Sequence, residues 1–304
     1  MKRVILPLIL SIALLSIPQA SAEAGIFSNY RAKVTHNKEL KNTQAKIKEI
    51  FVRQDEYTND HDIKGLSSLY AQNFINNDGF NKDVYFSLIE KTWQNYPSIM
   101  YDSKIKEIRL SGDYATVYAY ETASATTLEQ TENIQAYGEL RSVANTIYHL
   151  KKTGDKWLIV AEEILNEKSQ LKYGDARFIK MDLSSPELIN SGEEYTAFLN
   201  MELTDDESAV ATIDRQEIIH PLKEADEAFR QLTEENQLER VFRANNKNIN
   251  EYATASIGIA KAETFDKSKT RVYLSGVAFL MTRVNIIPKN EYITIEDKDA
   301  QTDK

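Results

Sequence analysis

The chain has 304 residues, with 37 Lys or Arg against 46 Asp or Glu, so its formal net charge is −9. An acidic chain without a basic cluster is a poor partner for nucleic acid, because phosphate binding needs gathered Lys and Arg side chains. The absence of cysteine excludes disulfide frameworks, thiolate metal sites and cysteine nucleophiles.

The first 22 residues have the pattern of a signal peptide. Lys2 and Arg3 precede an apolar run from Val4 to Ile17, and Ala20-Ser21-Ala22 forms a small-residue cleavage site. The apolar run is short for a membrane-spanning helix, which needs about 20 residues. We therefore expect cleavage after Ala22, a periplasmic or secreted mature chain, and no membrane span after cleavage.

The remaining length of about 280 residues favours two domains. Residues 23–42 are polar and mixed in charge and are expected to lead into a first domain at 43–173. A β-rich second domain follows at 174–288. Residues 289–304 have the polar, acidic composition of a disordered tail.

Three amphipathic helices are predicted at the start of the first domain. Apolar residues recur at three- and four-residue spacings in 47–57, in 63–74 and in 84–93. Asp60 or Asp62 is placed to cap the second helix. The sequence Asn76-Asn77-Asp78-Gly79 is a turn signal, and the third helix should end before Pro97.

From Met100 the period of the pattern changes to two. Strands are predicted at 101–110, 113–126, 139–152 and 156–166, with turns at Gly112-Asp113 and Thr153-Gly154-Asp155. The strand at 113–126 has two faces. One carries Tyr114, Thr116, Tyr118, Tyr120 and Thr122, and the other carries small apolar residues interrupted by Glu121.

The second domain reads as a mostly antiparallel, sandwich-like arrangement with one helical insertion. The predicted strands are 175–183, 193–203, 207–218, 251–262 and 270–287. The helical insertion follows His220-Pro221, and the segment 238–246 is compatible with a helix or a strand.

Residues 43–166 resemble the NTF2-like superfamily, of the SnoaL and ketosteroid-isomerase type. The resemblance rests on Asp62-Ile63-Lys64-Gly65-Leu66, on Leu69-Tyr70-Ala71-Gln72-Asn73-Phe74, and on Gly154-Asp155-Lys156-Trp157 at the start of the last strand. It implies an α+β fold in which a curved antiparallel sheet packs on helices and encloses a cavity. This fold hosts several enzyme classes as well as binding modules, so it does not by itself define a function.

The resemblance also implies where catalytic residues would lie. Asp78 matches the position of a general base, with an ordinary Asp-Gly turn as the alternative. Gln54 stands where the isomerases have a tyrosine, and Tyr57 is one turn away. His149 is the imidazole candidate for the cavity, with a surface or hydrogen-bonded structural role as the alternative. Ala161 and Glu163 occupy the alternate positions of the last strand at which many catalytic relatives carry a histidine.

We expect four further residues to line a ligand site or an interface, namely Tyr85, Tyr118, Tyr120 and Glu163. We expect no metal site and no cofactor. His61 between two aspartates fits a capping turn, and 76–79 lacks the ligand pattern of a calcium loop. No phosphate-binding loop, dinucleotide fingerprint or serine elbow occurs.

These observations favour a secreted or periplasmic, non-catalytic protein that binds a small apolar ligand or forms a homodimer through the first-domain sheet. The second domain would then contact a partner, such as an envelope protein. The alternative is a cavity enzyme, an isomerase, dehydratase or hydrolase with Asp78 or His149 as its base. Convergent ionisable groups in the cavity would favour the enzyme.

Overall fold

The computed structural model describes residues 22–131, 134–221, 230–233, 235–266 and 269–289. It divides into two compact units, Met1–Lys46 and Ile47–Lys304. Helix α1 (Ala22–Asn59) includes residues 23–42, which the sequence pattern assigned to a lead-in segment. Residues 1–21 of the predicted signal peptide, residues 290–304 of the predicted tail and most of the predicted helical insertion lie outside the described residues.

Two short helices and one strand follow α1. Asp62 caps α2 (Ile63–Ser68) by accepting a hydrogen bond from the Gly65 backbone N–H at 2.9 Å. The helix stops there, and the next residues form β1 (Tyr70–Asn76), where the sequence pattern predicted a continued helix. Asn81 then caps α3 (Lys82–Asn95), which ends two residues before Pro97.

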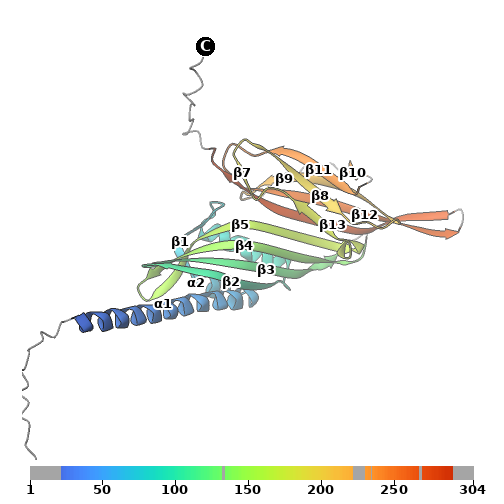
Figure 1. The fold of residues 1–304 in the computed structure, drawn as a ribbon. Coiled ribbons are helices and arrows are strands. Elements are labelled where there is room, and N and C mark those ends of the chain that lie inside the picture. The colour runs from blue at the N-terminus through green and yellow to red at the C-terminus, as the bar shows by residue number, and fades with distance from the viewer. Residues whose placement is uncertain (1–21, 132–133, 222–229, 234, 267–268, 290–304) are drawn as a thin grey trace, which may run out of the picture. The chain divides into compact units, whose positions relative to one another are not determined.

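Four long antiparallel strands come next, as the alternating pattern predicted (Figure 1). They are β2 (Met100–Ser111), β3 (Tyr114–Gln130), β4 (Tyr137–Thr153) and β5 (Lys156–Gly174). Two-residue turns join β2 to β3 and β4 to β5. Gly112 and Gly154 adopt positive φ angles of 58° and 61° in these turns, a conformation that glycine tolerates best.

The strands beyond β5 extend the sheet of β2 to β5 and also form a second, smaller sheet. Strand β13 (Lys269–Ile287) pairs with the second half of β5, and β1 pairs in parallel with its first half. Within the described residues, a ten-stranded sheet has eight strands in the order β10-β9-β12-β13-β5-β4-β3-β2, while β1 pairs with β5 and β7 pairs with β13. A second sheet has three strands in the order β11-β8-β6.

The remaining elements are short or belong to these two sheets. They are η1 (Asp175–Arg177), β6 (Met181–Ser184), β7 (Leu188–Asn190), β8 (Glu194–Met201), β9 (Glu207–Glu217), β10 (Arg230–Gln231), β11 (Gln237–Arg243) and β12 (Glu251–Asp266). The segment that the sequence left undecided, 238–246, is therefore largely strand.

Two hydrophobic cores stabilise the fold. In residues 47–174, which we call the helix–sheet region, helix residues such as Phe51 and Trp93 pack against Val117, Leu150 and Ile159 of the sheet. In residues 175–289, which we call the C-terminal β region, the second core draws on both sheets. Burial of such apolar surface is the main favourable term in folding.

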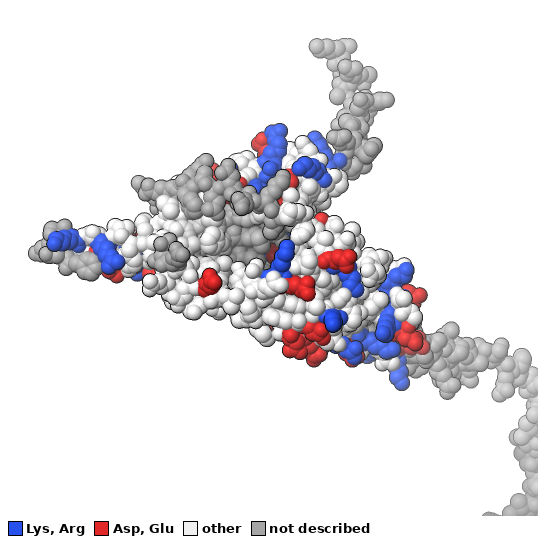
Figure 2. Space-filling model, turned by 180° about the vertical axis from the view of Figure 1, so that it is seen from behind, with Lys and Arg blue, Asp and Glu red and all other residues white. Residues whose placement is uncertain are grey.

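Charged side chains are mixed on the face shown in Figure 2, where Lys and Arg lie among Asp and Glu. No helix within the described residues combines the length and the apolarity that a membrane crossing requires.

Candidate functional site

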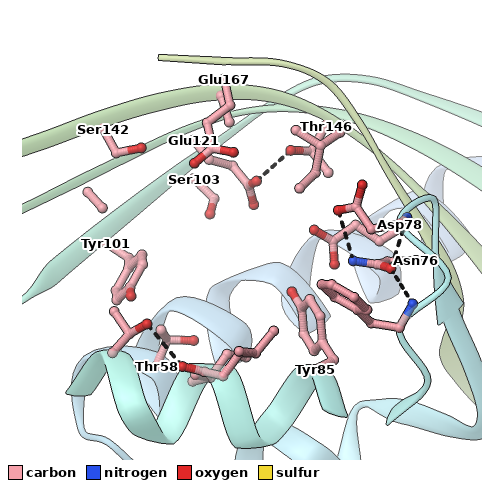
Figure 3. Close-up of a pocket in the computed structure, with 18 of the residues that line it drawn as sticks. Thr58, Asn76, Asp78, Tyr85, Tyr101, Ser103, Glu121, Ser142, Thr146 and Glu167 are labelled. Atoms are coloured by element: carbon pink, nitrogen blue, oxygen red, sulfur yellow. Dashed lines mark hydrogen bonds between the residues drawn. The ribbon is translucent and has the colours of Figure 1, made fainter. Parts of the chain in front are cut away.

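A cavity of about 400 Å³ lies in the helix–sheet region. Helices α1, α2 and α3 line one side, and β3, β4 and β5 line the other. Figure 3 shows Tyr85 reaching from α3 toward the strands that carry Glu121, Thr146 and Glu167. Aliphatic side chains line much of the wall, namely Leu66, Leu88, Ile89, Ile164, Ile218 and Ile219.

Glu162 is the buried carboxylate of this cavity. It is 5% exposed, and its Oε2 atom has no hydrogen-bond partner among the described residues. Burial, and then the negative charge of Glu121, raises its pKa to about 8, against an opposing effect of the Tyr85 hydroxyl. Near neutral pH this side chain is therefore largely protonated and can both give and take a proton.

Two bulges in β5 determine which of its side chains face the cavity. Leu150 pairs with Ile159 and His149 with Ala161, so Val160 is an extra residue in the strand. One extra residue reverses which side chains face the helices. The expected inward positions, Ala161 and Glu163, are thus replaced by Glu162 and Ile164, and Glu163 is exposed. A second extra residue, Leu165, directs Glu167 inward.

Glu121 is the centre of a hydrogen-bond network. Its two carboxylate oxygens accept hydrogen bonds from the Tyr148 hydroxyl at 2.6 Å and the Thr146 hydroxyl at 2.7 Å. Burial raises the pKa of Glu121, while these two hydrogen bonds lower it. The sequence shows Glu121 only as the one charge on the small apolar face of its strand, and that irregularity is the signal that marks it.

Gln54 extends the same network from helix α1. Its Nε2 group donates to the hydroxyls of Tyr70 at 3.1 Å and Tyr148 at 3.3 Å. The Oε1 atom of Gln54 is buried and has no hydrogen-bond partner among the described residues. The position where the isomerase pattern has a tyrosine is therefore occupied by an amide that reaches two tyrosines.

Asp78 lies at the edge of the cavity and forms a buried ion pair. Arg283 of β13 contacts both of its carboxylate oxygens, with Nη1 to Oδ2 at 3.2 Å and a shorter contact from Nη2 to Oδ1. Asn250 donates to Oδ1 at 2.9 Å. Asp78 also sits in the 76–79 turn, where the backbone N–H groups of Asp78 and Phe80 donate to the Asn76 side-chain oxygen. Asp78 therefore lies both in a turn and in the cavity lining. Both of its carboxylate oxygens already accept hydrogen bonds from Arg283, and one also accepts from Asn250.

The C-terminal β region completes the cavity wall. Ile218 and Ile219, which follow β9, line the cavity together with Tyr252 of β12. The Tyr252 hydroxyl donates to Glu167 at 2.9 Å, and burial raises the pKa of Glu167. The two regions therefore share one cavity, which the sequence pattern did not indicate.

The other predicted residues lie apart from the cavity lining. His149 alternates with the inward-facing Tyr148 and Leu150 and points to the opposite face of the sheet. Tyr57 packs at the edge of the hydrophobic core. Tyr118 and Tyr120 lie on the outer sheet face, where Arg109 and Lys106 cover their rings at 4.8 Å and 5.1 Å. Of the predicted site residues, Asp78 and Tyr85 line the cavity.

The carboxylates of the cavity are spread around its wall. Within the described ranges, no group of three or more His, Asp or Glu side chains is arranged to hold a metal ion. The expectation that the site needs no metal and no cofactor stays a prediction.

No family model matches the chain, and no curated protein matches its sequence. Solved structures of NTF2-like proteins are similar to about 40% of it. Bd1075 from Bdellovibrio bacteriovorus is 16% identical with a TM-score of 0.34, and the match covers 42% of this chain and 41% of that one, so the chain spans less than half of that protein.

In two further similar structures, the match covers most of the other protein. A protein of the NTF2-like family from Streptomyces avermitilis is 13% identical, with 41% of this chain and 95% of that chain covered and a TM-score of 0.33. The hexachlorocyclohexane dehydrochlorinase LinA-type3 from Novosphingobium barchaimii is 10% identical, with 42% and 88% covered and a TM-score of 0.34. At these identities the similarity concerns the fold alone.

Proposed function

We propose that this chain binds a small organic molecule in the cavity of the helix–sheet region. The observation that carries the proposal is Glu162, a buried carboxylate that lines the cavity with one oxygen unpartnered among the described residues. A buried polar atom without a partner is costly, and such atoms are kept where a ligand or a reaction uses them.

The size and chemistry of the cavity support the same proposal. Small-molecule sites typically enclose about 300–1,000 Å³, with apolar walls and a few polar groups that orient the ligand. This cavity has about 400 Å³, aliphatic side chains from α2, α3 and the C-terminal β region, and a polar wall on β3 to β5.

A cavity-filling variant tests the proposal. Ala144 lines the cavity on β4, so Ala144→Phe would fill part of the space. We expect a mixed panel of small neutral, anionic and cationic compounds to contain binders of the wild type, detected by ligand-observed NMR. Ala144→Phe should abolish their binding, whereas His149→Phe on the opposite face should not. Binding that survives Ala144→Phe would contradict the proposal.

Proton-transfer catalysis is the second candidate function. It is favoured by the pKa of Glu162, which burial raises to about 8 and so brings close to neutral pH, where general acids and bases work best. The hydroxyls of Tyr70, Tyr85 and Tyr148 line the same cavity and could stabilise developing negative charge. An isomerase, dehydratase or hydrolase of a small, partly apolar molecule would fit.

Hydrogen exchange of a bound compound distinguishes a catalyst from a protein that only binds. With a bound compound that carries an acidic C–H group, the wild type should exchange that hydrogen for solvent deuterium if the protein is a catalyst. Glu162→Gln should then lose at least 100-fold in exchange rate, the usual contribution of general acid–base catalysis. Binding without exchange would support the non-catalytic function.

Secretion and assembly complete the proposal. The sequence pattern of the first 22 residues supports export to the periplasm or the medium, and mass spectrometry of the exported protein would locate the cleavage site. A homodimer through the outer face of β2 to β5 would bury Tyr118 and Tyr120, and light scattering would measure it. Contact of the C-terminal β region with an envelope protein is a further proposal.

A further inference from the structure

The ionisable side chains of the lining, apart from its tyrosines, are all carboxyl groups. Among the described residues that line it, five are carboxylates and none is Lys, Arg or His. The carboxylates are Asp55, Asp78, Glu121, Glu162 and Glu167. Asp78 is paired with Arg283, and the other four have no ion-pair partner among the described residues. A site with this excess of acid is complementary to a cation.

Two buried atoms in the lining specify what kind of cation fits. Oε2 of Glu162 and Oε1 of Gln54 both lack a hydrogen-bond partner within the described part of the chain, and these residues are 5% and 8% exposed. The Gln54 oxygen is an acceptor, and Oε2 of Glu162 is one when that side chain is ionised, so the ligand complementary to the ionised site must donate N–H or O–H groups. Tyr70 lies beside both, since it hydrogen-bonds Gln54 and feels the charge of Glu162.

Aromatic rings surround the same space. The cavity is lined by Tyr70, Phe80, Tyr85, Tyr101, Tyr148 and Tyr252. The negative faces of aromatic rings attract organic cations, and a desolvated cation gains more from them than an exposed one. The aliphatic side chains of the wall, including Leu88 and Ile219, would contact an uncharged body of the ligand.

We propose that the ligand of this cavity is a protonated primary or secondary amine with an apolar body, whose N–H groups are accepted by Glu162 and Gln54. This inference rests on the proposed binding function and names the class of its ligand. A quaternary ammonium ion has no N–H group and would leave both acceptors unsatisfied.

Binding of an amine would be linked to protonation of Glu162. Burial raises the pKa of Glu162, so the free cavity holds it largely protonated near neutral pH, whereas an ammonium group favours the carboxylate. Amine affinity should therefore rise with pH up to about 8. The charged and titratable groups that face Glu162 or influence its charge are Tyr70 (β1), Asp78 (turn after β1), Tyr85 (α3), Glu121 (β3), Tyr148 (β4) and Arg283 (β13).

Four matched probes test the inference. They are 2-phenylethylamine, its N,N,N-trimethyl derivative, neutral 2-phenylethanol and anionic 3-phenylpropionate. Calorimetry with the full chain at pH 6, 7 and 8 would give their dissociation constants, with wild type, Glu162→Gln and Glu163→Gln. Glu163 is exposed and adjacent in sequence, so Glu163→Gln controls for the change in net charge.

The expected result is that the primary amine binds at least tenfold more tightly than the other three probes, and more tightly at pH 8 than at pH 6. Glu162→Gln should weaken amine binding at least tenfold and remove its pH dependence, and Glu163→Gln should change neither. Equal binding of amine and alcohol, or unchanged amine binding in Glu162→Gln, would overturn the inference.

The failure of the inference and the failure of the proposed function give different results. If the alcohol or the carboxylate binds best and Ala144→Phe abolishes that binding, the cavity is a binding site and the amine class is wrong. If an amine binds equally well to Ala144→Phe, it binds outside the cavity, and that result contradicts the amine assignment for this site.

Discussion

Two buried glutamates of this protein have opposite surroundings. Glu251 in the C-terminal β region is 0% exposed. Its oxygens accept hydrogen bonds from the Tyr195 hydroxyl at 3.0 Å and the Asn245 side chain at 2.7 Å, and Arg215 lies 3.3 Å from it. Glu162 is almost as buried, yet it faces a cavity and keeps one oxygen unpartnered among the described residues. Removing the partners of a satisfied buried carboxylate destabilises a structure, whereas a buried carboxyl group with an unpartnered oxygen and a shifted pKa is typical of a functional site.

The ion pair between Asp78 and Arg283 extends this comparison to the boundary between the two regions. Arg283→Met would leave the buried Asp78 carboxylate without its cation. We expect a loss of about 3–5 kcal/mol in the free energy of unfolding, measured by urea denaturation. The double variant Asp78→Leu with Arg283→Met should recover part of that loss, and a double variant that is still less stable would contradict the account.

Glu251→Gln tests the satisfied member of the comparison. The neutral amide loses the ion pair with Arg215. Its NH₂ group would replace a carboxylate oxygen, so a donor could face the two N–H donors of Asn245. We expect a loss of about 1.5–3 kcal/mol, the range for hydrogen bonds to charged groups. Thermal unfolding would measure it, and a change below about 0.5 kcal/mol would show that Glu251 contributes nothing to stability.

Glu162→Gln should raise the free energy of unfolding at pH 8, where Glu251→Gln should lower it. The folded pKa of Glu162, raised to about 8, lies above its ordinary value of 4.5, so the stability it contributes is present below pH 4.5 and is lost as pH rises toward 8. Wild-type stability should then fall by up to about 1.4 kcal/mol per pH unit in this window. The variant lacks this slope and should be about 1–2 kcal/mol more stable than wild type at pH 8.

Urea unfolding of both proteins at pH 5, 6.5 and 8 checks this prediction. Glu163→Gln at the exposed neighbouring position should change stability by less than about 0.5 kcal/mol at every pH. A Glu162→Gln protein that is destabilised at pH 8, as Glu251→Gln should be, would place Glu162 among the structural residues.

The smallest effect is expected for Tyr148→Phe. The change removes the 2.6 Å hydrogen bond to Glu121 and the contact from Gln54, which should cost about 1 kcal/mol. Because this hydrogen bond lowers the pKa of Glu121, the protonation midpoint of Glu121 should rise. NMR titration measures it, with Tyr118→Phe on the outer sheet face as control. An unchanged midpoint would show that the Tyr148 hydroxyl does not stabilise the Glu121 carboxylate.

The sequence pattern predicted much of the fold. The alternation from Met100 onward located β2, β3, β4 and the start of β5, and Gly112 and Gly154 occupy the predicted turns. Strand β1 was missed because apolar residues in 69–74 also fit helical spacing. The pairing of β5 with β13 joins segments distant in sequence, and periodicity carries no information about such pairing.

The candidate site was less predictable than the fold. The predicted site residues Asp78 and Tyr85 do line the cavity. The bulge at Val160 reverses which side chains of β5 point inward, so Glu162 lines the cavity where Glu163 was expected. A bulge adds one residue without a distinctive sequence signal here. The partner of Asp78, Arg283, lies 205 residues away in the chain, so only the folded structure brings them together.

The protonation midpoint of Glu162 tests the central claim most directly. Carbon-13 NMR of glutamate carboxyl groups in the full chain, with the Glu162 signal assigned by its loss in Glu162→Gln, would measure it. We expect a midpoint near 8, because burial and the charge of Glu121 raise the pKa of Glu162. A midpoint near 4.5, the ordinary value, would show a solvated or paired carboxylate and would contradict a functional cavity centred on Glu162.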